Sequence, residues 1–207
     1  MHPYLQDTEY ATRNLLALAK DEEQRLAELF ERLRSKEAEV KAHDWDFRTS
    51  DMNDDFSDAY VMAAFSRRGR AHQEAQVLHQ SAAALQASVG SHQHAVQAIA
   101  GAVLQIAKQG VSLVHGQDAL KLAPTGRNIG SLALRDIIWQ ARNQSMHYEE
   151  GNLNKWVVGL FATLEAEHGA SFSLTVHAKQ NRAKQVVDLL GWSDYAAFSK
   201  DMQTLMP

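Results

Sequence analysis

The sequence predicts an all-α protein, an elongated up-and-down helical bundle with a long N-terminal helix and a short C-terminal helical appendage. Alanine, leucine and glutamine are abundant, whereas the 207 residues include only 3 prolines and 11 glycines. Such a composition favours long uninterrupted helices over many short strands. The hydrophobic share of 45% and the charged share of 22% are ordinary for a globular chain and exclude a disordered or collagen-like protein.

Composition and hydropathy also limit the chemistry and the location of the protein. Cysteine is absent, which excludes disulfides, a thiolate nucleophile and zinc–thiolate clusters. The opening segment, MHPYLQDTEY, lacks the basic and apolar regions of a signal peptide. No stretch approaches the roughly 18 apolar residues that a membrane span needs. We therefore expect a soluble cytoplasmic protein with no membrane partner.

The first helix is predicted over residues 5–40, where apolar positions recur on one stripe between Glu and Arg residues. The polar, acidic segment 43–55 is expected to be a connection, with Trp45 and Phe47 anchoring it to the bundle. Helical composition then resumes over residues 56–87.

Two glycines interrupt the next helical stretch in the sequence. Gly69 favours a kink, and Gly90 with Ser91 is predicted to end this helix before the next one begins. Residues 95–114 are apolar on nearly every face and predict the central buried helix of a bundle.

The C-terminal half is divided by glycines and one internal proline. Residues 116–130 form the clearest loop, and a helix is predicted from about Ser131 to Gly151 at the latest. The next helix is closed by Gly169. Alternating apolar residues over 171–177 are consistent with a strand or with an extended arm.

The last predicted elements are two short helices within residues 181–205, broken at Gly191. Their apolar residues are expected to dock this part of the chain onto the bundle. We therefore expect a helical-bundle domain over residues 1–168 and a C-terminal helical appendage over residues 169–207.

The sequence contains ten histidines, which are common metal ligands, but they do not form a complete ligand set. The HExxH motif is absent, and Glu165 with His168 lacks the second such pair that a carboxylate–histidine site requires. His72 and His79 share a helical face, but Glu74 does not lie on it. A P-loop and a GxGxxG segment are also missing, so we expect neither a metal nor a cofactor.

The strongest chemical pattern is RNQSMH, from Arg142 to His147, which follows the apolar stretch LALRDIIWQA. Arg67 and His72 have the same spacing but lack this context. The RNQSMH segment resembles the R-N-x-x-x-H signature of the HEPN superfamily, helical-bundle proteins that include toxin ribonucleases. The resemblance covers the motif helix and the all-helical layout of about residues 55–168.

The helical geometry of this motif constrains how its residues meet. One turn separates Asn143 from His147, so these two share a face, whereas Arg142 lies about 140° from His147. Arg142 and His147 therefore meet only if the helix bends or a second chain contributes. RNA cleavage without a metal needs a base, an acid and a cation at the phosphate, and histidine can serve in either proton-transfer role.

The HEPN resemblance implies a metal-independent endoribonuclease that forms 2′,3′-cyclic phosphate and 5′-hydroxyl ends at a composite homodimer site. It implies catalytic roles for Arg142, Asn143 and His147: Arg142 suits phosphate contact, and Asn143 can orient its neighbours. We expect Arg135 and Tyr148 to contact the RNA substrate. An antitoxin or a defence-system protein is a candidate partner.

Two alternatives remain open from the sequence. His147 can cap the helix C-terminus while Arg135 and Arg142 pair with nearby acidic residues, and Trp139 can belong to the core rather than stack on a base. The protein can also be a non-catalytic helical interaction or nucleic-acid-sensing protein, with residues 5–40 making the contacts. The mild positive balance of residues 75–148 is too small to decide between them.

Overall fold

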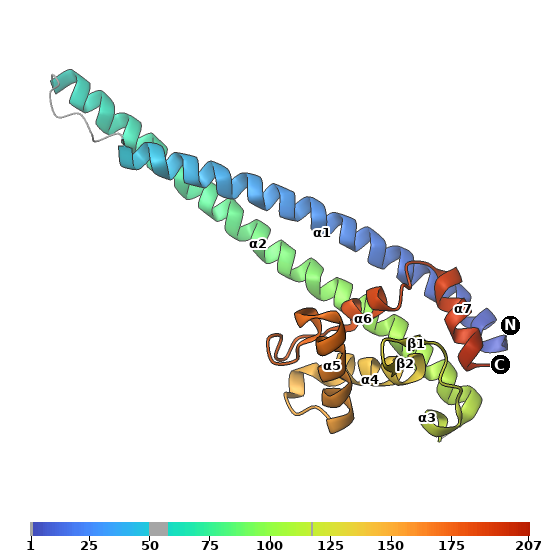
Figure 1. Cartoon of the computed structure of the whole chain (residues 1–207). Coiled ribbons are helices and arrows are strands. Elements are labelled where there is room, and N and C mark those ends of the chain that lie inside the picture. The colour runs from blue at the N-terminus through green and yellow to red at the C-terminus, as the bar shows by residue number, and fades with distance from the viewer. Residues whose placement is uncertain (1, 50–57, 117) are drawn as a thin grey trace. The chain divides into compact units, whose positions relative to one another are not determined.

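The computed structural model describes residues 2–49, 58–116 and 118–207; within 42–75, it describes only the side chains of Trp45, Ser66, Arg70 and Gln73. Most of the described chain is helical, which confirms the all-α class (Figure 1). The α-helices are α1 (Pro3–Thr49), α2 (Asp58–His115), α3 (Ala119–Leu122), α4 (Leu134–His147), α5 (Lys155–His168), α6 (Ala183–Leu189) and α7 (Tyr195–Leu205). Two short 3-10 helices, η1 (Tyr148–Glu150) and η2 (Ala170–Phe172), and an antiparallel hairpin of β1 (Asn128–Ile129) and β2 (Leu132–Ala133) complete these elements.

The chain divides into two compact units. Unit 1 comprises residues 1–22 and 94–207, and unit 2 comprises residues 23–93. Helices α1 and α2 contribute residues to both units. The motif helix α4 lies wholly in unit 1, so the candidate site can be described within that unit alone.

Unit 2 is built from parts of α1 and α2 that run side by side in opposite directions (Figure 1). Two residues of the predicted stripe on α1, Leu33 and Val40, are buried here, whereas Leu18, which belongs to the same predicted stripe but lies in unit 1, is 44% exposed. The predicted connection is wrong for residues 43–49, which continue α1 as a helix. Trp45 is 69% exposed, so its side chain is not buried in the bundle. The expectations for the Phe47 side chain and for residues 50–55 lie outside the described part.

Helix α2 continues through both Gly69 and Gly90, so the predicted break at Gly90 is wrong. A single glycine inside a helix costs about 1 kcal/mol relative to alanine. Burying one valine contributes about 1.5–3 kcal/mol. Val89 and Val96 are both buried on either side of the glycine. The energy of packing this helical face therefore exceeds the propensity cost on which the predicted break depended.

Two glycines of α2 give a matched pair of predictions for stability. A Cβ at Gly110 would lie 2.6 Å from Cε1 of Tyr4 and 2.9 Å from Sδ of Met206, whereas one at Gly90 would have nothing within 4 Å. The Tyr4 hydroxyl donates to the Ile106 carbonyl at 2.8 Å, which restricts the ring. We expect Gly110→Ala to lower the free energy of unfolding by about 1–3 kcal/mol. Gly90→Ala should raise it by up to about 1 kcal/mol.

Urea titration followed by circular dichroism measures both changes in the free energy of unfolding. Equal effects of the two substitutions would contradict the close approach of Tyr4 to α2. A stabilising effect of Gly110→Ala would do the same.

The core of unit 1 is arranged around α2 and α4. Val103, Leu104 and Ala107 of α2 are completely buried, as predicted for residues 95–114, but Leu113 is 65% exposed, so this helix is not covered on every side. Helix α4 begins at Leu134, close to the predicted start. It packs against α5 and α6.

The C-terminal segments belong to the same core. Residues 171–177 contain the end of η2 followed by turns, so both the predicted strand and the extended arm are wrong. The break at Gly191 between α6 and α7 is confirmed, and its φ of 70° is one that glycine adopts readily. Trp192 and Phe198 are buried in this core. The expected domain boundary at residue 168 therefore falls inside unit 1.

No helix in the described part of the chain has both the length and the apolar character that a bilayer span requires.

Candidate functional site

The predicted motif lies at the C-terminal end of α4, which is held in place by its apolar face. Ile137 and Ala141 of that face are completely buried. Gln144, 1% exposed, donates to the Gln180 carbonyl at 2.8 Å and accepts from the Arg182 backbone N–H at 2.9 Å. The opposite face, which carries the motif side chains, is therefore presented from a fixed helix.

Arg142 binds only neutral groups in the described part of the chain. Its Nε donates to Oε1 of Gln105 on α2 at 2.5 Å, and its Nη1 lies 3.4 Å from Oδ1 of Asn143. The Asn143 amide in turn donates to Oε1 of Gln140 at 3.4 Å. The ion pair that the sequence allowed for Arg142 is absent among the described residues. The guanidinium is thus oriented by α2 without neutralisation of its charge.

His147 ends α4 and contacts an acidic residue one turn later. Its Nδ1 lies 2.6 Å from Oε1 of Glu150, and the two side chains are 51% and 62% exposed. No other described residue hydrogen-bonds to His147, so Nε2 has no hydrogen-bond partner among them. A short contact of this kind to one ring nitrogen fixes the orientation of the imidazole and the identity of its protonated nitrogen.

One chain does not bring Arg142 and His147 together. Helix α4 is continuous through both residues, so they stay about 140° apart around its axis. Trp139 and Asn143 lie between them on the same helical face. Helix α4 therefore does not have the bend that would bring Arg142 and His147 together within one chain. That a second chain brings them together stays a prediction.

Arg135 and Tyr148 are both engaged with neighbouring groups. Arg135 donates to Oδ1 of Asp136 at 2.9 Å and to the Ala123 carbonyl at 2.7 Å, and its side chain is only 14% exposed. The Tyr148 hydroxyl donates to Oε1 of Glu149 at 2.8 Å, and this hydrogen bond raises the pKa of the phenol. Arg135 therefore holds α4 to the preceding loop, as the structural alternative allowed.

Lys108 of α2 is a site residue that the sequence did not indicate. Its Nζ lies 4.5 Å from the centroid of the Trp139 ring, within the range of a cation–π contact. Burial and the nearby charge of Arg142 lower the pKa of Lys108. Lys108 stands out in the sequence as the only Lys, Arg, Asp or Glu between Glu74 and Asp118. The sequence alone does not show that it lies beside Arg142.

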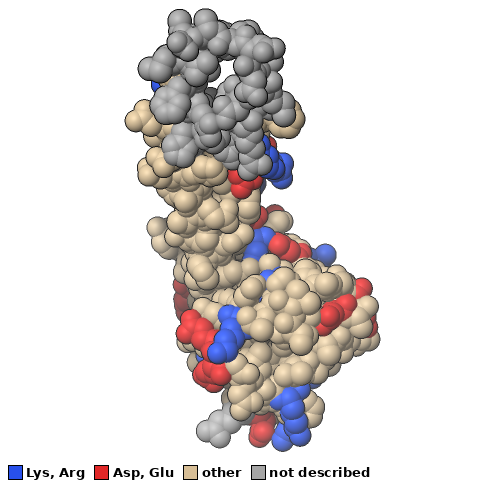
Figure 2. All heavy atoms as spheres, turned by 90° about the vertical axis from the view of Figure 1, so that its left-hand side faces the viewer, with Lys and Arg blue, Asp and Glu red and all other residues tan. Residues whose placement is uncertain are grey.

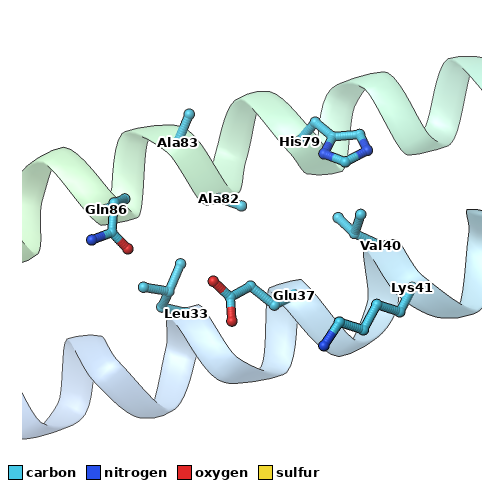
Figure 3. Close-up of a pocket in the computed structure, with 8 residues that line it drawn as sticks. All are labelled: Leu33, Glu37, Val40, Lys41, His79, Ala82, Ala83 and Gln86. Carbon is cyan, nitrogen blue, oxygen red and sulfur yellow. The ribbon is translucent and has the colours of Figure 1, made fainter.

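A separate shallow groove lies between α1 and α2 of unit 2 (Figure 3). Leu33 and Val40 point into it from α1, opposite the small side chain of Ala82. Glu37 and His79 also contribute to its lining. This groove holds no cluster of convergent catalytic groups comparable to the motif on α4.

A metal centre is not supported by the described residues. None of their His, Asp and Glu side chains form a group of three that could hold a metal ion. His168, which the sequence offered with Glu165 as a candidate metal-binding pair, instead has its Nε2 3.9 Å from Oε2 of Glu167. That carboxylate accepts from the Ser131 backbone N–H at 3.1 Å, and hydrogen bonding to the side chain and then the backbone of Ser131 lowers the pKa of Glu167.

Surface charge is scattered on the face shown in Figure 2. Lys and Arg form small groups separated by uncharged and acidic residues, without a continuous basic band. On this face, a nucleic acid would meet only local groups of cations rather than a broad electrostatic footprint.

Comparisons with protein-family models, curated proteins and solved structures find no match for this chain. The chemistry of the site residues is therefore the basis for a functional proposal. They offer an oriented imidazole, a guanidinium without an acidic partner and a lysine beside an aromatic ring.

Proposed function

We propose that the protein is a metal-independent endoribonuclease of HEPN type, acting through a composite site at a homodimer interface. One observation carries the proposal: Glu150 orients the half-exposed His147 through Nδ1, while Arg142, on the same helix, has only neutral hydrogen-bond partners among the residues that the structure describes. The first feature suits proton transfer, and the second suits a phosphate.

The proposed reaction needs two proton transfers and one site for developing negative charge. A base removes the proton of the RNA 2′-hydroxyl, and the resulting oxygen attacks the adjacent phosphorus. The bond from phosphorus to the 5′ oxygen breaks, and an acid protonates that oxygen. The products are a 2′,3′-cyclic phosphate and a 5′-hydroxyl, while Arg142 stabilises the charge on the phosphoryl oxygens.

The homodimer supplies what one chain lacks. Each chain contributes one motif histidine, and a two-fold axis would bring two of them into one cleft, one as base and the other as acid. A neutral His147 that donates from Nδ1 to Glu150 presents an unprotonated Nε2, which is the form a base requires. Asn143, hydrogen-bonded to Gln140, would orient the groups between Arg142 and His147. A toxin or antiviral-defence role, with a protein inhibitor as partner, fits such an enzyme.

Incubation of the purified protein with an end-labelled RNA pool in EDTA tests the proposal. We expect cleavage, with 3′ product ends that can be ligated only after the cyclic phosphate has been opened and the resulting phosphate removed to leave a 3′-hydroxyl. Cleavage that EDTA abolishes would contradict a metal-independent mechanism. Intact RNA in every condition would contradict ribonuclease activity for the isolated protein.

Glu150 should act as a positioning residue for His147. We expect Glu150→Gln to lower kcat about tenfold with little change in KM, because proton transfer by a positioned side chain is typically worth about 10²–10⁴-fold and the loss of this exposed carboxylate disturbs only the orientation of the imidazole. Glu149→Gln is the matched control, because Glu149 binds the Tyr148 hydroxyl rather than the imidazole. Steady-state cleavage of a fluorogenic RNA measures both variants. Equal losses in both would show that Glu150 has no specific role.

A non-catalytic interaction role is the second candidate, favoured by the surface of unit 2. Val77 is 62% exposed and Trp45 69% exposed, and Phe30 is exposed at 36%. Large apolar side chains of this kind are common at protein interfaces. An inactive protein in the RNA assay would favour this role over catalysis.

A further inference from the structure

Two cations, Lys108 and Arg142, lie beside each other where α2 meets α4 in unit 1, and neither has an acidic partner among the described residues. Gln105 and Lys108 are one turn apart on α2, and Trp139 and Arg142 are one turn apart on α4. Gln105 accepts from Arg142 at 2.5 Å, while Lys108 lies 4.5 Å from the ring centroid of Trp139. The two contacts therefore connect the helices at successive turns and fix the lysine near the arginine.

This arrangement leaves positive charge uncompensated. In the described part of the chain, neither Lys108 nor Arg142 forms an ion pair with a carboxylate. Both side chains are only partly exposed, and the repulsion between them contributes to the lowered pKa of Lys108. Placing like charges together in a partly buried site is unfavourable unless an anion binds there.

The aromatic ring indicates what kind of anion would fit. Trp139 is partly buried and packs against the core, and the ammonium of Lys108 lies over its ring. A nucleobase can stack on an indole face, and a cation can then contact the phosphate attached to the same nucleotide. The neutral amides of Gln105 and Asn143, next to Arg142, add hydrogen-bonding groups without adding negative charge.

We propose that Lys108, Arg142 and Trp139 form a nucleotide subsite for single-stranded RNA. Arg142 and Lys108 bind the phosphodiester, and the base stacks on Trp139 as the ammonium moves from the ring to the phosphate. The choice of RNA rests on the proposed function. The binding of a phosphate and a base rests on the cation pair and the ring themselves.

Binding of an uncleavable RNA tests this subsite separately from catalysis. The probe is a fluorescein-labelled single-stranded oligonucleotide with 2′-O-methyl groups throughout, which lacks the attacking hydroxyl, and anisotropy in EDTA gives the Kd at several salt concentrations. We expect Lys108→Gln to weaken binding about fivefold to tenfold. It should also reduce the slope of log affinity against log salt by about 0.7, the value for one contact to a single strand.

Lys155→Gln is the matched control. Lys155 also lies over a tryptophan, with Nζ 5.3 Å from the ring centroid of Trp156. No arginine interacts with Lys155 in the described part of the chain, so this variant should bind the probe as the wild type does. Equal losses in Lys155→Gln and Lys108→Gln would overturn the subsite, because a general loss of positive charge would then explain both.

The aromatic contribution has its own variants. Trp139→Leu should weaken binding at least fivefold without changing the salt slope, because stacking releases no counterions. Trp139→Phe keeps an aromatic face and should recover part of the affinity, which separates stacking from a folding defect. Equal binding by Phe, Leu and wild-type proteins would overturn the role of the ring.

The subsite and the ribonuclease proposal can fail independently. If the probe binds as expected but unmodified RNA stays intact, the subsite stands and the catalytic proposal fails. If RNA is cleaved while Lys108→Gln binds the probe with unchanged affinity and salt slope, the subsite fails and catalysis stands. A wild-type protein that does not bind the probe would also overturn the subsite.

Discussion

Replacement of His147 by alanine should reduce the rate of RNA cleavage by about 10²–10⁴-fold, the range typical of general acid–base catalysis. In a homodimer, the substitution removes both motif histidines at once, so the loss should lie at the upper end of this range. The side chain is 51% exposed and contacts only Glu150 among the described residues. The free energy of unfolding should therefore change by no more than about 0.5 kcal/mol.

The control for this prediction is His72→Ala. His72 follows Arg67 at the same spacing as the motif pair but lacks the adjacent asparagine. The His72→Ala variant should cleave RNA at the wild-type rate. Initial rates of cleavage of a single labelled RNA compare the variants, and circular dichroism shows that each is folded. A folded His147→Ala protein that retains wild-type activity would contradict the assigned role.

The composite site also predicts that RNA cleavage depends on protein concentration. If His147 residues from two chains are needed, the activity per chain should fall when the protein is diluted below the dissociation constant of the dimer. Sedimentation at the same concentrations gives the oligomeric state. A strictly monomeric protein that still cleaves RNA would contradict the two-chain mechanism.

The sequence predicted the helices well where their signal was local. The end of α5 before Gly169 and the break at Gly191 follow from glycine chemistry, and the stripe on α1 follows from residue spacing except at Leu18, which is exposed. The break at Gly90 was wrong because its cost of about 1 kcal/mol is smaller than the packing energy of the face that contains Val89. Propensity alone does not include that packing.

The features of the site that the sequence did not predict depend on tertiary contacts. Arg142 and His147 could be named from their spacing, and the angle between them from helix geometry. The contact of Arg142 with Gln105 joins residues 37 positions apart, and no local pattern indicates it. The same is true of Lys108, which lies beside Trp139 only because α2 and α4 pack together.

The second large effect is expected at Asp201, the most connected acidic residue of the unit 1 core. Its side chain is 9% exposed and accepts from Nε and Nη2 of Arg127, both at 2.8 Å. It also accepts from Nε1 of the buried Trp192 at 2.9 Å. This carboxylate raises the pKa of Arg127 and connects the loop before β1, the turn after α6 and helix α7.

Asp201→Ala should lower the free energy of unfolding by about 3 kcal/mol. Removing one member of a buried ion pair typically costs about 3–5 kcal/mol. The value should lie at the lower end because Arg127 is 46% exposed and can be rehydrated. The indole N–H of Trp192 has no such access, and an unsatisfied buried donor alone costs about 1–3 kcal/mol. For a chain of this size, the loss corresponds to a fall in Tm of about 6–12 °C.

Two further substitutions separate the network from a general effect of losing an aspartate. Asp201→Asn keeps one acceptor oxygen and the shape of the side chain, so it should lose about half as much stability as alanine does. Asp188→Ala removes the exposed ion pair with Lys184, in which Asp188 is 59% exposed, and should cost less than about 0.5 kcal/mol. Thermal unfolding followed by near-ultraviolet circular dichroism measures all three variants. Loss of the Asp201 carboxylate leaves the buried indole N–H of Trp192 without an acceptor, which should cost more than loss of the exposed Asp188 pair. If Asp201→Ala is no more destabilising than Asp188→Ala, the carboxylate does not hold α7 to the core.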